Sequence, residues 1–174
     1  MKNTKKNLRK SGAWFVKHVT IVPDGDAELA ALETLNPRDT AVVQQSFAGA
    51  LEGLSLQADT TATIDLTNYH PDRMTYQYSA ATEQLAVFPE QYYPADKGWK
   101  CYLNGQPYQD IIKANYLLRA LRLPAGQNMV LEMRFEPASW KRGTQIGSIA
   151  SVLVLVLLGA GLFFWYRSGG ISND

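Results

Sequence analysis

Several stretches of the chain alternate apolar and polar residues with a period of two. They cover residues 62–67, 73–79 and 128–136, and Met74, Tyr76 and Tyr78 illustrate the pattern. This period is typical of strands that bury one face and expose the other to water. A short, wholly apolar run at 85–88 predicts a further strand at the centre of a sheet.

The first part of the chain predicts two more strands with a helix between them. Residues 14–22 are rich in β-branched and aromatic side chains and predict a single strand that ends at Pro23. Acidic residues then precede leucines at helical spacing, which predicts a short helix, because carboxylates stabilise a helix N-terminus. These residues are Asp24, Asp26 and Glu28, followed by Leu29, Leu32 and Leu35. Residues 36–37, Asn-Pro, end this helix, and residues 40–45 predict the next strand.

Turn signals separate the predicted strands. The pair Asn104-Gly105 predicts a two-residue hairpin, since both residue types tolerate positive φ. Residues 70–72 and 124–126 predict further turns. Roughly six to nine strands at about ten-residue spacing, with one short helix, predict a mainly β fold, an antiparallel β-sandwich.

Residues 146–166 contain no charged side chain. A helix of this length, at ~1.5 Å per residue, crosses the roughly 30 Å hydrocarbon core of a bilayer. Aromatic and cationic residues, which prefer the headgroup layer, stand at both ends: Trp140, Lys141 and Arg142, then Trp165, Tyr166 and Arg167. The alternative is a buried core helix, which normally carries polar residues on one face. We therefore predict a basic lead at 1–12, a β-sandwich domain at 13–140, a transmembrane helix at 144–166 embedded in the lipid bilayer, and a short tail at 167–174.

Composition and charge narrow the function classes. The chain has 174 residues and a net charge of +1, so its total charge does not indicate a nucleic-acid partner. The basic lead is interpreted as a solvated or juxtamembrane tail, and binding to anionic lipid headgroups is the alternative. Cys101 is the single cysteine, so no internal disulfide is expected. Lys17 and His18 interrupt the first apolar run too early for a secretory signal.

The sequence has no recognisable catalytic or cofactor-binding motif. It lacks a phosphate-binding Gly-rich loop, HExxH, CxxC and GxSxG. Asp24-Gly25-Asp26 starts like a calcium loop, but the sixth and twelfth positions hold Leu29 and Leu35 instead of Gly and Glu. Zinc is disfavoured because one cysteine and two distant histidines are too few ligands. Paired carboxylates for glycoside hydrolysis stay open, since acids on different strands can converge. We predict no metal, no cofactor and no catalytic residue.

The densest aromatic and polar cluster lies between residues 92 and 119. Exposed aromatic rings stack on the apolar faces of sugars, while amides and guanidinium groups reach hydroxyls. The candidate ligand-binding residues are Tyr92, Tyr93, Trp99, Asn115, Tyr116 and Arg119. The alternative is that Trp99 and the tyrosines fill the core and edge of the sandwich, with Arg119 on a solvated strand.

Two segments and the span that follows them resemble a known pattern. QYYPADKGWKCYLNGQP (91–107) and IIKANYLLRALRLPAGQNMVLEMRFEP (111–137) look like the C-terminal end of the YfhO family of bacterial membrane proteins. GAWFVKHV, DAELAALETLNPRDTAVV and QLAVFPEQYYP are similar to the same family in the same order, so the resemblance covers most of 12–166. The Ala95-Asp96-Lys97 loop is longer than the family's usual Pro-Lys-Gly-Trp, and Gln127-Asn128 stands where Lys-His is common.

The resemblance implies a function as well as a fold. Family members are large polytopic proteins that resemble family C glycosyltransferases and are implicated in glycosylating cell-surface polymers from polyprenyl-phosphate sugars. The matched part would be an extracytoplasmic β-domain with the last span in the bacterial cytoplasmic membrane. Since no position here matches the upstream helices or their catalytic acidic loop, we expect no catalysis by this chain alone.

The resemblance suggests one interpretation of the chain, and two others stay open beside it. The first is a C-terminal fragment, truncated product or detached half that works with a polytopic membrane partner as an accessory domain, holding a surface glycan or covering the active site. The second is an independent tail-anchored carbohydrate- or protein-binding module, whose domain would lie in the cytoplasm. The third is an inert remnant that does not fold alone.

Overall fold

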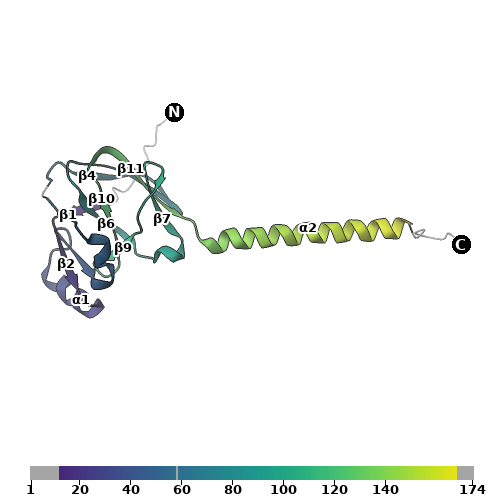
Figure 1. The fold of residues 1–174 in the computed structure, drawn as a ribbon, viewed down its shortest axis with the longest axis horizontal. Coiled ribbons are helices and arrows are strands. Elements are labelled where there is room, and N and C mark those ends of the chain that lie inside the picture. Colours follow the sequence, from purple (N-terminus) through teal and green to yellow (C-terminus); the bar gives the residue numbers. More distant parts are fainter. Residues whose placement is uncertain (1–11, 58, 168–174) are drawn as a thin grey trace, which may run out of the picture. The chain divides into compact units, whose positions relative to one another are not determined.

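The computed structural model describes residues 12–57 and 59–167. The chain divides into two compact units, Met1–Glu136 and Pro137–Asp174. The first unit is mainly β and contains the sheets, and the second contains the long helix α2 (Figure 1). The predicted tail beyond residue 167 and the basic lead before residue 12 lie outside the described residues.

One sheet of the first unit has four antiparallel strands in the order β1-β6-β10-β9. These strands are Trp14–Val16, Gln84–Gln91, Leu118–Leu123 and Ile112–Ala114, in the same order. β6 lies between β1 and β10, and its residues 85–88 are fully buried. The prediction of a central strand at this apolar run is therefore confirmed.

The second sheet has five antiparallel strands in the order β4-β5-β11-β7-β8. They are Thr63–His70, Arg73–Ala80, Gly126–Phe135, Trp99–Leu103 and Gln106–Pro107. The period of two is confirmed in β5, where Met74, Tyr76 and Tyr78 are buried and Arg73 and Gln77 are exposed. The 3₁₀ turn η2, Ala95–Lys97, precedes β7.

The predicted turns join these strands. Asn104 and Gly105 connect β7 to β8 with φ of 49° and 79°, as a tight hairpin requires. Pro71 and Asp72 connect β4 to β5. The chain crosses from the four-stranded to the five-stranded sheet between Leu123 and Gly126. The predicted mainly β fold with antiparallel sheets is confirmed.

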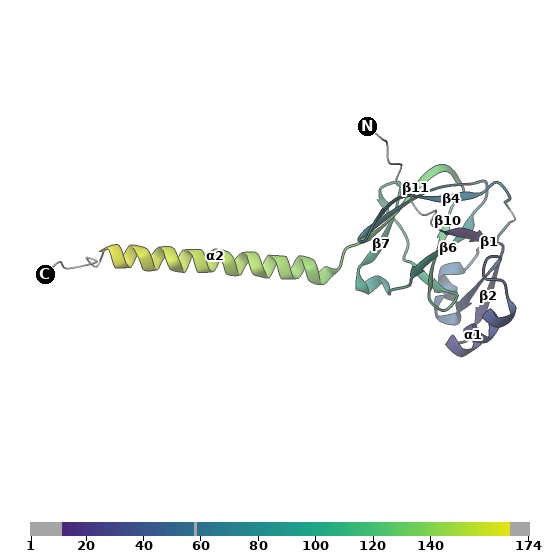
Figure 2. The same cartoon turned by 180° about the vertical axis from the view of Figure 1, so that it is seen from behind.

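The main core lies where the two sheets face each other (Figures 1 and 2). Tyr76 of β5 meets Phe88 of β6 edge to face, with ring centroids 4.9 Å apart. Leu121 of β10 and Leu131 of β11 are buried in the same cluster. Burying each such side chain contributes about 1.5–3 kcal/mol. A second core forms on the opposite face of β6, where Leu85 and Val87 meet residues of β3 and η1.

A βαβ unit covers that second core and corrects one prediction. It consists of β2, α1 and β3 (His18–Val22, Gly25–Thr34 and Thr40–Gln44), followed by the 3₁₀ helix η1, Gln45–Leu51. Residues 14–22 do not form the single predicted strand. Lys17 and His18 both donate their backbone N–H to the Asp39 carbonyl at 2.8 and 3.0 Å. The chain bends there, so β1 joins β6 while β2 pairs with β3 in parallel.

The predicted helix between those strands is confirmed as α1. Asp24 caps it, because its carboxylate accepts a hydrogen bond of 2.9 Å from the Ala27 N–H. The parallel pairing of β2 and β3 needs this helix as a crossover connection. It is the one parallel pair among the described strands, and the sequence pattern did not predict it.

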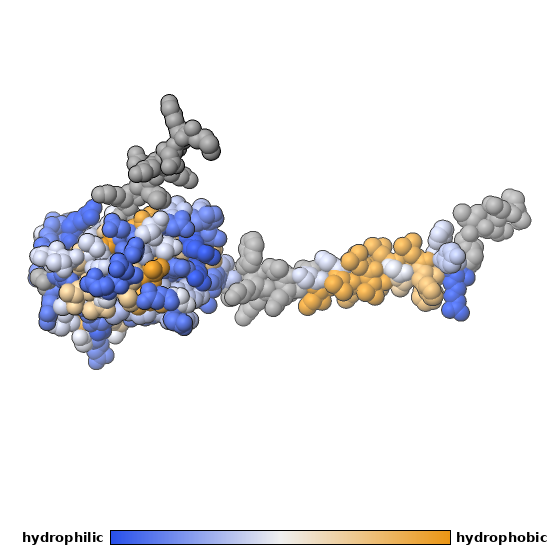
Figure 3. All heavy atoms as spheres, turned by 90° about the horizontal axis from the view of Figure 1, so that it is seen from above, coloured by the Kyte–Doolittle hydropathy of each residue, from blue (hydrophilic) through white to orange (hydrophobic). Residues whose placement is uncertain are grey.

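The second unit is the helix α2, Ala138–Arg167. Its stretch Ser148–Arg167 is long and apolar enough to cross a membrane, with a mean hydropathy of 2.3. None of that stretch is buried within the structure. Figure 3 shows the apolar side chains, coloured orange, along the face of α2 that it presents.

Candidate functional site

Arg119 is the centre of the predicted aromatic cluster. It lies on the inward face of β10 with Leu121 and Leu123, and only 4% of it is exposed. Its Nε donates a 2.9 Å hydrogen bond to the Gln91 carbonyl on β6. Its guanidinium lies 4.2 Å from the centroid of the Trp99 ring, a cation–π contact between the two sheets. The part of the alternative that placed Arg119 on a solvated strand is therefore wrong, whereas Trp99 and Tyr92 pack against the main core as that alternative expected.

A carboxylate lies close to this buried cation. Burial lowers the pKa of Arg119, while the charge of Glu90 acts in the opposite direction. Glu90 on β6 accepts a 3.2 Å hydrogen bond from the Tyr76 hydroxyl through Oε1. Its Oε2 and the Arg119 Nη1 have no hydrogen-bond partner among the described residues. Both atoms are buried, so the pair lies within the fold and not on a surface that a ligand reaches.

Aromatic side chains surround this pair. Trp99 stacks at a tilt on Phe135 of β11, with centroids 5.5 Å apart. Tyr92 is half-buried, its backbone N–H donates to the Leu117 carbonyl at 2.7 Å, and burial raises the pKa of its hydroxyl. Tyr93 is exposed. Four of the six predicted residues, Tyr92, Tyr93, Trp99 and Arg119, thus lie at the end of the sandwich where β6 ends and β7 begins.

The other two predicted residues serve a different part of the fold. Asn115, with φ of 48°, donates its backbone N–H to the Val42 carbonyl at 2.8 Å, and its Oδ1 accepts from the Val42 N–H at 2.8 Å. Asn115 therefore completes the edge of β3 much as a neighbouring strand would. Tyr116 is partly exposed, has φ of 69°, and donates its backbone N–H to Glu28.

Glu28 is a buried carboxylate whose role the sequence did not reveal. It is completely buried, and its Oε1 accepts from the Tyr116 N–H at 2.7 Å. Its Oε2 accepts from the Gln44 side chain at 2.8 Å and lies 3.5 Å from the Lys113 ammonium. The sequence indicated only that Glu28 suits a helix N-terminus. In the structure, it connects α1 to β3, β9 and the β9–β10 loop.

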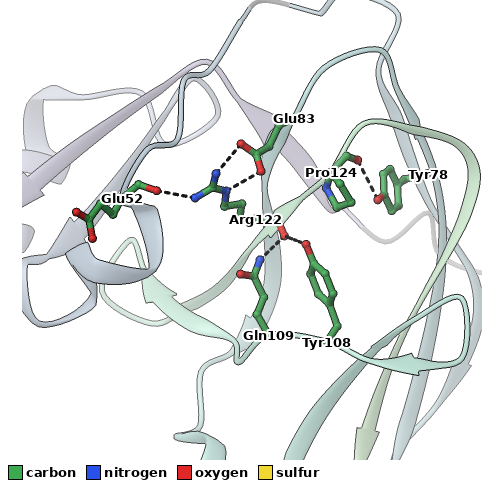
Figure 4. A network of polar contacts seen from close by, with 7 residues as sticks. All are labelled: Glu52, Tyr78, Glu83, Tyr108, Gln109, Arg122 and Pro124. Atoms are coloured by element: carbon green, nitrogen blue, oxygen red, sulfur yellow. Dashed lines mark hydrogen bonds and ion pairs between the residues drawn. The ribbon is translucent and has the colours of Figure 1, made fainter.

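A second polar network holds the other end of β10 (Figure 4). The Arg122 guanidinium donates to both carboxylate oxygens of Glu83 at 2.7 and 2.8 Å, and to the Glu52 carbonyl at 2.8 Å. This hydrogen bonding to Glu83 raises the pKa of Arg122. The Arg122 carbonyl accepts from Tyr108 at 3.1 Å and from Gln109 at 2.5 Å. The Arg122 guanidinium and carbonyl find these partners within the fold, so we interpret the network as structural.

Two pockets lie near β1 and β2, and the lining of each includes two ionisable side chains, Lys17 with Asp59 in one and Lys17 with His18 in the other. One of about 320 Å³ lies between β1 and the residues before β4, and Gln84 is among its lining residues. Another of about 380 Å³ lies beside β2 and is lined mainly by Val19, Ile21 and leucines of η1 and the segment after it. In the described part of the chain, no group of three His, Cys, Asp or Glu side chains is placed to hold a metal.

The fold and the site together define a β-sandwich domain that continues into a helix able to cross a membrane. The chain is 28% identical over 141 residues to the uncharacterized protein YfhO of Bacillus subtilis (strain 168). That match covers 80% of this chain but spans 14% of the relative's length. No protein-family model matches the chain, and no solved structure matches it.

Proposed function

We propose that this chain is the membrane-anchored accessory domain of a YfhO-like membrane protein. The observation that carries the proposal is a β-sandwich followed directly by an apolar helix. Four-fifths of this chain, including most of that sandwich, is similar to YfhO. The chain corresponds to a small part of that relative. A polytopic partner would therefore supply the remaining helices.

The accessory role we propose is support for the glycosylation of cell-surface polymers from lipid-linked sugars. The domain lies on the outer side of the bacterial cytoplasmic membrane and holds the acceptor polymer, while the partner performs the chemistry. Tyr93 and the partly exposed Trp99 provide aromatic surface for a sugar ring, and the buried Arg119 supports the Trp99 ring from within the fold. This assignment rests on the family resemblance and on the composition of the site.

The outward orientation is tested by single-cysteine labelling. Glu33 on α1 is exposed, so Glu33→Cys reports on the domain, and Ser168→Cys reports on the residues after the span. The native Cys101 gives little background because it is buried and burial raises its pKa to about 12. We expect a membrane-impermeant maleimide to label Glu33→Cys in spheroplasts, and Ser168→Cys only after permeabilisation. The reverse pattern would reject the proposed side of the membrane.

The accessory role is tested by deleting the gene and measuring the sugar content of the surface polymers. We expect a loss that the wild-type chain restores and that Tyr93→Ala restores only partly. Ile21→Ala is the matched control, because Ile21 is an equally exposed apolar residue on β2. Unchanged polymers in the deletion strain would exclude the role, and full restoration by Tyr93→Ala would exclude Tyr93 from polymer binding.

A further inference from the structure

Three aromatic side chains are exposed on β4, on β11 and in the segment between β6 and β7. They are Tyr69, Tyr93 and Phe135, with exposed fractions of 56%, 46% and 43%. Aromatic side chains are costly to leave in water, and a group of them commonly marks a binding surface. Together with the neighbouring cations Arg73, Lys97 and Lys100, we call this group the exit rim.

Backbone pairing places the exit rim where the chain leaves the sheet. Phe135 pairs with Trp99 of β7, and its N–H donates to the Asp72 carbonyl in the β4–β5 turn at 2.8 Å. Tyr69 lies next to that turn on β4. The next residue after Phe135, Glu136, donates its N–H to Gly98 at 2.6 Å, and Gly98 follows the short loop that contains Tyr93.

Two of these aromatics belong to the face of the sheet that elsewhere builds the core. Tyr69 is paired with Met74, which is buried, and paired residues on adjacent strands point to the same side. Phe135 follows the buried Met133 by two residues, so it points to the same side as Met133. At the exit rim the opposite sheet no longer covers this face, which leaves apolar surface for another partner.

The covalent chain keeps the exit rim close to any bilayer that α2 crosses. Only Glu136 and Pro137 separate Phe135 from α2, and the apolar stretch begins at Ser148. At ~1.5 Å per helical and ~3.5 Å per extended residue, this connection reaches about 25 Å at most. The opposite end of β11 is separated from the exit rim by the length of the strand, ~30 Å at ~3.4 Å per residue.

We propose that the exit rim binds the headgroup layer of the bilayer, with Tyr69, Tyr93 and Phe135 as interfacial anchors. Aromatic rings and the long stems of lysine and arginine prefer this layer, because each joins an apolar body to a polar or charged end. Lys100 and Arg73 are exposed and have no ion-pair partner among the described residues. Asp72, Asp96 and Glu136 offset the three cations, so the aromatics provide the binding and neutral lipids suffice. This inference holds for either side of the membrane, and its test needs neither polymer nor partner. It uses the same Tyr93 that the proposed function assigns to the sugar, so the two assignments of that ring compete.

A spin label tests the proposal on the full chain in phosphatidylcholine vesicles. Asp96→Cys places the label in the loop of the exit rim, and Gln127→Cys places it at the start of β11; both positions are exposed. We expect collisions with a water-soluble nickel complex to be several-fold rarer at position 96 than at 127. Equal accessibility of the two labels, or protection that needs an anionic lipid, would overturn the proposal.

Substitutions then identify the anchors. Tyr69→Ser combined with Tyr93→Ser is expected to raise the accessibility at position 96 to that at position 127. Phe135 stays unchanged in this variant because it packs on Trp99. Ile21→Ser combined with Leu29→Ser removes equally exposed apolar residues elsewhere and is expected to preserve the protection. A melting temperature close to that of the wild type confirms that both variants fold, and persistent protection in the Tyr69/Tyr93 variant would overturn the assignment.

Discussion

Glu28→Ala is the most direct test of the arrangement that joins α1 to the sandwich. The Glu28 carboxylate is fully buried and accepts hydrogen bonds from the Tyr116 N–H and the Gln44 side chain. Lys113 lies 3.5 Å from it with 21% of its side chain exposed. Removing the carboxylate leaves these donors without their acceptor and opens a void between α1 and β9.

The expected cost follows from these contacts. Breaking a buried ion pair by removing one partner costs ~3–5 kcal/mol. Since Lys113 can regain part of its hydration, we expect about 3 kcal/mol for Glu28→Ala, within the roughly 5–15 kcal/mol that stabilises a typical domain. Glu28→Gln keeps an acceptor for Tyr116 but brings an amide NH₂ towards Gln44 and Lys113, and we expect a cost of about 1–2 kcal/mol.

The measurement is urea denaturation of the full chain in mild detergent, followed by the β-sheet circular dichroism signal. Glu33→Ala is the matched control, because Glu33 lies on the same helix and is exposed, so its expected effect is within about 0.5 kcal/mol. The order of stability should be wild type and Glu33→Ala, then Glu28→Gln, then Glu28→Ala. A Glu28→Ala variant as stable as the control would refute the role of this carboxylate.

Three further predictions follow from single contacts. Burial raises the pKa of Cys101 from 9.0 to about 12, so the folded state keeps a proton that the unfolded state loses, and the free energy of unfolding should fall between pH 9 and 12. Denaturation curves at pH 8 and pH 10 should show that Cys101→Ala removes about 1.4 kcal/mol of the fall between these two pH values. A double-mutant cycle of Arg122→Ala and Glu83→Ala should give a coupling of about 1 kcal/mol, since the pair is bidentate but partly exposed; a coupling of zero would contradict its geometry. Gly105→Ala should lower the free energy of unfolding by ~1 kcal/mol, because the φ of Gly105 is 79°. Gly49→Ala is the control: Gly49 lies in η1 with open space around it, so this variant tests whether replacing any glycine lowers the free energy of unfolding by a similar amount.

Much of the fold could be predicted from local patterns. The alternation in 73–79 identified the buried face of β5, and Asn104-Gly105 identified the β7–β8 hairpin. Residues 14–22 have the composition of one continuous strand, because β1 and β2 are both rich in β-branched and aromatic residues. What separates them is a long-range contact, the Asp39 carbonyl that binds two successive N–H groups, and no local pattern encodes it.

The candidate site was only partly accessible to sequence reasoning. The cluster of aromatic and polar residues led to Trp99 and Arg119, which the structure brings into contact. Glu90 was missed because nothing in its own segment indicates that it lies near a cation on the next strand. Asn115 was grouped with the cluster by residue type, but its amide is used to complete the edge of β3. Their roles in ligand binding stay predictions.

Local sequence was enough to predict the apolar helix, the half-buried strands, the tight hairpin and the short helix with an acidic start. Each depends on neighbours a few residues apart, so hydrophobic period and turn chemistry are sufficient. The tertiary structure alone decided the sheet to which β1 and β2 belong, the burial of Glu28, and the meeting of Arg119 with Trp99. These features depend on contacts between residues far apart in the chain, where the balance of burial and hydrogen bonding is set by the whole fold.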